Sequence, residues 1–137
     1  MKNSDCIFCK IANGEISTTA IYEDDDFKVF MDAGPATLGH VLVVPKDHYK
    51  NIFEMPEEYL AKAIIVAKKV GTELKDALQA DGLNIVQNNG EVAGQTVDHF
   101  HIHLIPRYRE DGQTIGWKPG KLDDNMISKV KESMKKI

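Results

Sequence analysis

Apolar residues recur along this chain with two different spacings. From 56 to 78 they return every three or four positions, a period that predicts an amphipathic helix with Pro56 at its first position. Short β-branched or alternating runs instead predict strands at 19–23, 27–31, 39–45, 83–87 and 99–106. Two shorter helices are expected, one within 5–16 that ends near Gly14 and one that Asp123 caps. The apolar stripe of that last helix consists of Met126, Ile127, Val130 and Met134.

The order of these elements indicates an α+β fold. Hairpin-like neighbouring strands occur towards both ends of the chain, which favours an antiparallel sheet with one long helix and short terminal helices. The sequence contains no repeat, low-complexity tract or linker. We therefore predict one domain spanning 1–137, with its core at about 5–107 and a C-terminal extension with a helix at 108–137.

Composition and charge disfavour several classes of protein. The 42% hydrophobic and 28% charged residues are ordinary for a globular domain. A net charge of −4 disfavours general nucleic-acid binding, which needs clustered Lys and Arg. No apolar run approaches the ~20 residues of a membrane span, and the N-terminus lacks the features of a signal peptide. Two cysteines make no disulfide framework, so we expect a cytoplasmic protein with reduced thiols and no nucleic-acid or membrane partner.

Three of the five histidines stand at alternate positions, at His99, His101 and His103. Alternate side chains of a strand share one face and are about 6.6–6.8 Å apart. A one-residue slip in register would bury the imidazoles and expose the apolar set on the other face, Phe100, Ile102 and Leu104. Three interpretations are open: a solvated strand face, a metal site, or a catalytic group with an imidazole nucleophile. Three alternate histidines on a straight strand reach one zinc ion poorly, which favours catalysis.

A loop of mostly small residues at 91–96 leads into this strand. Gly94 permits close approach of the backbone to a ligand. Exposed main-chain N–H groups and the Thr96 hydroxyl could hold phosphate oxygens. Beside three histidines, such a loop favours phosphate chemistry.

The run 99–105 has the pattern His-φ-His-φ-His-φ-φ, with φ apolar, and through it the chain resembles the histidine triad family. The similarity covers nearly the whole chain and includes the run GHVLVVPK at 39–46. It implies a homodimer whose two sheets join into one, with a purine nucleotide in a cleft of each subunit. The positions that match the family's nucleotide contacts are Asp32, His40, Asn88, Gly94, Gln95 and Thr96.

The resemblance also implies a mechanism. His101 would attack the α-phosphorus of a nucleoside monophosphate group, and water would release the nucleoside monophosphate from the resulting nucleotidyl-histidine. A neutral imidazole suits this role because its pKa is ~6.5. His103 would contact the leaving group or phosphate, His40 the phosphate, and Asp32 the ribose hydroxyls. Contacts to phosphate-side oxygens are expected from Asn88 and Thr96. The candidate base pocket, whose members also have a plain core interpretation, consists of Phe8, Ile11 and Leu42.

Three positions narrow the branch of the family. His103 stands where the sugar-phosphate nucleotidylyltransferases carry Gln, which favours hydrolysis. Asp32 and Asn88 match the purine nucleoside phosphoramidases, whereas dinucleoside polyphosphate hydrolases of the fragile-histidine type carry Asn and Gln there. The motif's tail, His-Leu-Ile-Pro-Arg, also resembles the dinucleotide enzymes. A nucleoside phosphoramidate and a dinucleoside polyphosphate both stay open as substrates. So do two other functions, a non-catalytic nucleotide-binding regulatory protein and a zinc-dependent metallohydrolase with its metal on the triad.

Cys6 and Cys9 form a C-x-x-C pair near the N-terminus. A thioredoxin-like redox site needs a preceding strand, for which there is no room, and reducing cytosol disfavours a disulfide. A buried thiol pair and half a zinc site are the remaining interpretations. Zinc needs two further ligands, and His48 has no other role. With His99 they would make a closed, structural Cys2His2 site with one zinc per chain, which resembles histidine triad members with an N-terminal C-x-x-C.

Overall fold

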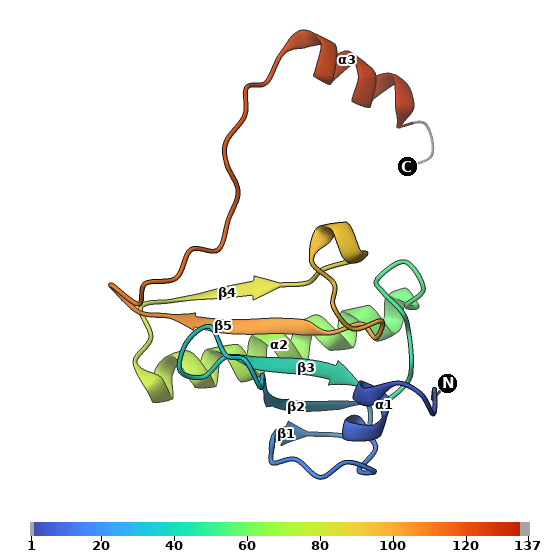
Figure 1. The fold of residues 1–137 in the computed structure, drawn as a ribbon, viewed down its shortest axis with the longest axis vertical. Coiled ribbons are helices and arrows are strands. Elements are labelled where there is room, and N and C mark those ends of the chain that lie inside the picture. Colours follow the sequence, from blue (N-terminus) through green and yellow to red (C-terminus); the bar gives the residue numbers. More distant parts are fainter. Residues whose placement is uncertain (1, 135–137) are drawn as a thin grey trace.

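The fold is built on one antiparallel sheet (Figure 1). The structure, a computed structural model, describes residues 2–134. Its strands lie in the order β1-β2-β3-β5-β4. Their bounds are Ala20–Glu23 for β1, Phe27–Met31 for β2, Val41–Pro45 for β3, Gly82–Val86 for β4 and Ile102–Arg107 for β5. The helices are α1 at Ile7–Ala12, α2 at Glu57–Leu78, the short 3-10 helix η1 at Glu91–Ala93, and α3 at Asp124–Ser133. The predicted α+β class is confirmed.

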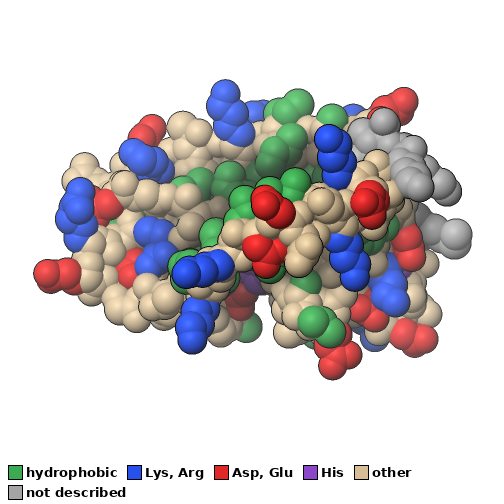
Figure 2. All heavy atoms as spheres, turned by 90° about the horizontal axis from the view of Figure 1, so that it is seen from above, with side chains coloured by type: hydrophobic (Ala, Val, Ile, Leu, Met, Phe, Trp, Pro, Cys, Tyr) green, Lys and Arg blue, Asp and Glu red, His purple; other side chains and the backbone are tan. Residues whose placement is uncertain are grey.

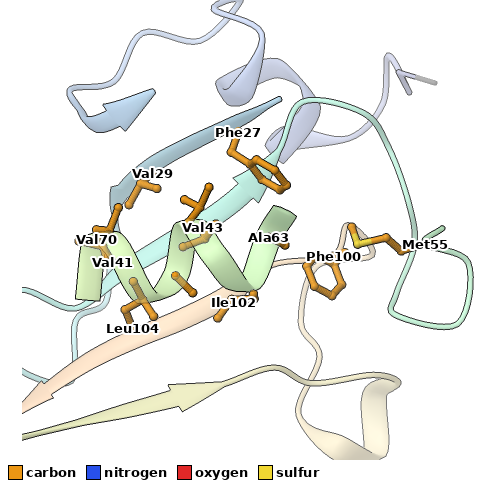
Figure 3. Packing of buried hydrophobic residues seen from close by; sticks show 12 residues of the cluster. Phe27, Val29, Val41, Val43, Met55, Ala63, Val70, Phe100, Ile102 and Leu104 are labelled. Atoms are coloured by element: carbon orange, nitrogen blue, oxygen red, sulfur yellow. The ribbon is translucent and has the colours of Figure 1, made fainter. Parts of the chain in front are cut away.

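The long helix α2 covers one face of the sheet and has the predicted period (Figure 3). Its buried stripe packs against apolar side chains of β2, β3 and β5 and consists of Ala63, Val66, Ala67 and Val70. Gly71 allows a close approach, because a Cβ there would lie 2.7 Å from a methyl carbon of Leu83. The helix begins at Glu57 rather than at Pro56, since Pro56 has an extended backbone and precedes the first helical residue.

The short helix α1 covers the opposite face beside β3 (Figure 1). It ends at Ala12, before Gly14, which takes a φ of +84°. The ammonium of Lys28 in β2 donates to the carbonyl of Ile11 at 3.2 Å and so holds the C-terminal end of α1 on the sheet. A second, smaller apolar cluster lies beneath α1 and consists of Ala12, Phe30, Leu42 and Val44.

The strand that carries the histidines begins three residues later than predicted. β5 starts at Ile102, and its ladder with β3 covers only Val41–Val43. Beyond that point the carbonyl of Pro45 accepts from the His99 ring at 2.8 Å. The N–H of Phe100 donates instead to the carbonyl of Tyr49 at 2.7 Å. A side chain and a loop thus replace the ladder at this end.

The alternation of faces is nevertheless confirmed. The side chains of Phe100, Ile102 and Leu104 are buried in the core under α2. His99 and His101 lie on the other face, but α1 covers them, and only 0% and 5% of their surfaces are exposed. The imidazoles are therefore buried in the correct register, which strand alternation alone does not predict.

The C-terminal helix α3 is capped as predicted, because the Asp123 carboxylate accepts from the N–H of Met126 at 2.9 Å. It stands away from the sheet at the end of an extended segment (Figure 1). Its apolar stripe is exposed, at Met126, Ile127, Val130 and Met134. Among the residues that the structure describes, no helix is long and apolar enough to cross a membrane.

Candidate functional site

The two cysteines and two of the histidines meet beside α1. Cys6 caps this helix, Cys9 lies within it, His48 follows β3 and His99 precedes β5. The Nδ1 atoms of His48 and His99 are 3.2 Å apart. Each sulfur lies 3.3–3.4 Å from one or both of these nitrogens. A tetrahedral zinc site with ordinary bond lengths would give separations of about 3.3 Å between nitrogens and about 3.5 Å between nitrogen and sulfur. The four side chains therefore fit a zinc ion.

The hydrogen bond of His99 fixes which of its ring nitrogens carries the lone pair. Its Nε2–H donates to the carbonyl of Pro45 at 2.8 Å, so the lone pair is on Nδ1, which faces the sulfurs. Burial lowers the pKa of His99 to about 4, which keeps the ring neutral near pH 7. Burial raises the pKa of the Cys9 thiol, and a bound cation would reverse this by favouring the thiolate.

His101 presents an unprotonated ring nitrogen. Its Nδ1 lies 2.7 Å from the carbonyl oxygen of His99, which can only accept, so Nδ1 carries the proton and Nε2 the lone pair. Burial lowers the pKa of this ring. Phe8 of α1 contacts it edge-on, with ring centres 5.0 Å apart. A neutral imidazole held in one tautomer and orientation is a competent nucleophile near pH 7.

His103 and His40 form a hydrogen-bonded pair. The N–H of Ala36 donates to Nδ1 of His40 at 2.9 Å, so the proton of the neutral His40 ring is on Nε2. That nitrogen lies 2.9 Å from Nδ1 of His103 and 3.4 Å from a carboxylate oxygen of Asp32. His40 therefore donates to His103, whose own proton is left on Nε2. Burial lowers the pKa of both rings, that of His103 to about 4, although the Asp32 carboxylate opposes the shift.

Asp32, His40 and His103 also place three atoms that metals favour within 4.8 Å of one another. A metal would need a lone pair on Nε2 of His40, but Ala36 occupies Nδ1 and so directs the proton to Nε2. We therefore interpret this group as a hydrogen-bonded network. A metal shared by the three triad histidines is disfavoured as well, because the ring of His99 faces the two cysteines and not His40 and His103.

Gln95 holds the loop before the triad together. Its side-chain oxygen accepts from the N–H of Gly90 at 2.8 Å, and its amide donates to the carbonyls of Lys50 and Val97 at 2.6 and 3.0 Å. Only 5% of the residue is exposed. Its side chain therefore shapes the loop, and a ligand contact from Gln95 would have to come from its main chain.

The other loop residues named from the sequence lie closer to solvent. Gly94 has a φ of +99°, which favours glycine, and a Cβ there would lie 3.3 Å from the amide nitrogen of Asn88. Gly94 and Thr96 are exposed, and Asn88 is partly buried. A cavity of about 450 Å³ opens here, lined by Glu91, Gly94, Gln95, Thr96 and Asp98.

The three candidates for a base pocket lie together in one apolar cluster. Leu42 is buried with Phe30 in the small apolar cluster, and the partly buried Phe8 and Ile11 pack against that cluster. The rings of Phe8 and Phe30 meet edge-on at 5.8 Å. Because Phe8 also contacts His101, it connects this apolar floor to the triad.

Known proteins resemble this chain over most of its length. A profile of the HIT domain matches residues 13–110. This chain belongs to the HIT family. An uncharacterised HIT-like protein of Methanocaldococcus jannaschii is 52% identical over 110 residues, which are 80% of this chain and 84% of that protein. An adenosine 5'-monophosphoramidase of Saccharomyces cerevisiae is 38% identical over 134 residues, 96% of this chain and 82% of that protein. The crystal structure of a Zn-bound histidine triad family protein from Mycobacterium smegmatis has a TM-score of 0.77 and 37% identity, and the match covers 85% and 84% of the two chains.

Sequence reasoning missed the main-chain groups of this HIT site. The carbonyls of Pro45 and His99 set the tautomers of His99 and His101, and the N–H of Ala36 sets that of His40. Every residue has such groups, so no residue type signals their role. A weak signal exists for Ala36, which lies four residues before His40 in a turn that contains Gly34, Pro35 and Gly39.

Proposed function

We propose that this HIT protein hydrolyses purine nucleotide conjugates, either nucleoside phosphoramidates or dinucleoside polyphosphates, through a nucleotidyl-histidine on His101. The observation that carries the proposal is the fixed tautomer of His101, with its lone pair on Nε2. The similarity to a yeast adenosine 5'-monophosphoramidase supports nucleotide hydrolysis. Asp32 and Asn88, which match the phosphoramidases, favour a phosphoramidate as the substrate.

The first step forms a bond and breaks a bond at phosphorus. Nε2 of His101 attacks the α-phosphorus, and the bond from phosphorus to the leaving nitrogen or oxygen breaks. His103 directs its Nε2–H to the leaving atom as a hydrogen bond and stays neutral, and the leaving group takes its proton from solvent. The carbonyl of His99, at 2.7 Å from Nδ1, stabilises the positive charge that develops on the His101 ring. Because both rings are held before the reaction, little reorganisation is needed.

The second step restores the enzyme. Water attacks the phosphorus and loses its proton to solvent. The bond from phosphorus to His101 breaks, the nucleoside monophosphate leaves, and Nε2 of His101 regains its lone pair. By donating to Nδ1 of His103, His40 keeps the His103 proton on Nε2, where it can hydrogen-bond the leaving group in the first step.

Substrate binding is assigned to the residues around this pair. Asp32 would accept from the ribose hydroxyls and His40 would help to hold the phosphate. The phosphate oxygens would also contact Asn88, Gly94, Thr96 and the main chain of Gln95. The base would lie on the apolar surface of Phe8, Ile11 and Leu42. Leu42, with 4% of its surface exposed, contributes as the floor of that surface.

We assign one structural zinc per chain to Cys6, Cys9, His48 and His99. When bound, zinc would cross-link α1 to the segment that leads into β5 and would supply no chemistry to the reaction. The donor set supports this role, because four protein ligands close a tetrahedral site. A cytoplasmic location is part of the same proposal, since two free thiols persist in reducing surroundings.

We also propose that two copies join through β4. This strand lies at the edge of the sheet and pairs with β5 on one side. Figure 2 shows apolar side chains gathered in the middle of the face seen from above, with charged residues around them. Ile85 of β4 is 48% exposed, and Ile65 of α2 is 61% exposed. An exposed edge of this kind is a template for pairing with a second chain. Light scattering on a chromatographic peak would give the mass of two chains, and a mass of one chain would refute the dimer.

One substrate panel tests the proposed activity. The protein is incubated with adenosine phosphoramidates, diadenosine polyphosphates and sulfated nucleotides, and kcat/KM is compared for each. We expect the highest value for a phosphoramidate, with His101→Ala as the inactive control. Binding of nucleotides without turnover of any of them would instead indicate a non-catalytic nucleotide-binding protein.

A further inference from the structure

The segment that follows β5 folds back on the loop that carries His40. The loop at 33–39 joins Asp32 to His40, and its base is closed by a bond from the N–H of Asp32 to the carbonyl of His40 at 3.1 Å. The tip of the loop is held by residues from the C-terminal side of the molecule. Tyr108 donates its hydroxyl to the carbonyl of Leu38 at 2.8 Å, and Gln113 donates its side-chain amide to the carbonyl of Ala36 at 2.8 Å.

A clamp fixes Gln113 in this place. Arg107, the last residue of β5, binds the carboxylate of Asp111 with two nitrogens at 2.9 and 3.0 Å. The same carboxylate accepts from the N–H groups of Tyr108 and Gln113, and Arg107 donates to the Gln113 carbonyl at 2.8 Å. A bidentate guanidinium–carboxylate pair of this kind has a defined geometry. The turn at 107–113 is therefore held firmly against the sheet, and it presents Gln113 to the loop.

Ala36 is where this turn meets the catalytic histidines. Its carbonyl accepts from Gln113, and its N–H donates to Nδ1 of His40. Ala36 thus connects Gln113 to the His40 ring, and the Nε2–H of His40 in turn selects the tautomer of His103. His103 and Arg107 both belong to β5, so the strand that anchors the turn of Gln113 also carries the histidine that His40 contacts.

We propose that Gln113 is a positioning residue for the triad: through the main chain of Ala36 it keeps His40 in the Nε2–H tautomer and so keeps the proton of His103 on the side of the leaving group. Gln113 lies beyond residues 13–110, which the HIT domain profile matches. The extension predicted at 108–137 therefore contributes its first turn to the site. The expected effect of Gln113 on kcat rests on the hydrolysis proposed above, but its expected effect on the His40 tautomer does not.

The experiment compares four full-length proteins: wild type, Gln113→Met, Gln113→Lys and Lys118→Met. Gln113→Met removes the amide donor at similar size, Gln113→Lys keeps a donor of similar reach, and Lys118→Met removes a polar group from an exposed position further along the same segment. Two quantities are measured on each, the nitrogen-15 shifts of the His40 and His103 rings by NMR, and kcat and KM for the best substrate of the panel.

For Gln113→Met we expect the nitrogen shifts of His40 to move from a single tautomer towards an average of two. We expect kcat to fall about three- to tenfold with KM within about twofold of wild type, the scale that one neutral hydrogen bond sets. Gln113→Lys should restore both quantities, and Lys118→Met should change neither.

Wild-type shifts for His40 in Gln113→Met would overturn the proposal, as would an equal loss of kcat in Lys118→Met. A merely structural role would lower stability without moving the His40 tautomer. If wild type turns over no substrate, the hydrolysis fails, yet the NMR comparison still decides whether Gln113 positions His40.

Discussion

Gly39, which directly precedes His40, provides a test of how tightly the site is built. It has a φ of +90°, and a Cβ placed on it would lie 2.5 Å from a methyl carbon of Leu78 and 3.1 Å from Cγ of Pro106. A side chain at such a φ costs about 1–2 kcal/mol, and forcing extra volume into a packed site costs about 1–3 kcal/mol. The leucine methyl can rotate away, whereas the proline ring cannot. We therefore expect Gly39→Ala to lower the free energy of unfolding by roughly 2–5 kcal/mol.

Gly14 supplies the matched control. Its φ of +84° is similar, but a Cβ there would have no atom within 4 Å. Gly14→Ala should therefore cost only about 1–2 kcal/mol, the backbone part alone. Urea unfolding followed by circular dichroism measures both, and this signal is preferable to the fluorescence of Trp117, which is 88% exposed. We also expect a loss of kcat for Gly39→Ala and not for Gly14→Ala. Equal destabilisation by the two substitutions would refute the packing argument.

Three further predictions address the metal and the ribose. Metal analysis should find one zinc per chain, and a ratio near zero with both cysteines free would exclude the assigned site. Chelation or Cys9→Ser should lower the melting temperature, because a closed site contributes to folding. Activity should fall only as far as the protein loses stability, and loss of activity with an unchanged thermal transition would make the metal catalytic. Asp32→Ala should raise KM for ribonucleotides more than it lowers kcat, and a 2'-deoxy substrate should respond much less; an equal response of the two sugars would remove Asp32 from the ribose site.

The parts of the fold that rest on periodicity were predictable. The stripe of α2 and the alternation of Phe100, Ile102 and Leu104 are confirmed because burial of apolar surface dominates their placement. The start of β5 was predicted wrongly at His99. There a side-chain bond to the Pro45 carbonyl replaces a ladder bond, and no local pattern encodes that exchange.

The candidate site divides in the same way. The structure brings together the four residues that the family resemblance implied as metal ligands: Cys6, Cys9, His48 and His99. Such a resemblance can predict contacts between positions far apart in the sequence, which residue spacing alone cannot. The structural use of the Gln95 side chain and the bond from Gln113 to Ala36 were not predicted. Both depend on main-chain carbonyls brought near by the folded chain, and such groups leave no trace in residue type.

The central claim is that Nε2 of His101 becomes bonded to phosphorus during turnover. Rapid quenching of wild type with an α-labelled nucleotide substrate, followed by proteolysis and mass spectrometry, measures this directly. We predict an adduct that is labile in acid and stable in alkali, located on the peptide with His101, and absent from His101→Ala, which should keep nucleotide affinity but lose several decades of kcat. Wild-type kcat in His101→Ala, with no adduct on either protein, would contradict the covalent mechanism.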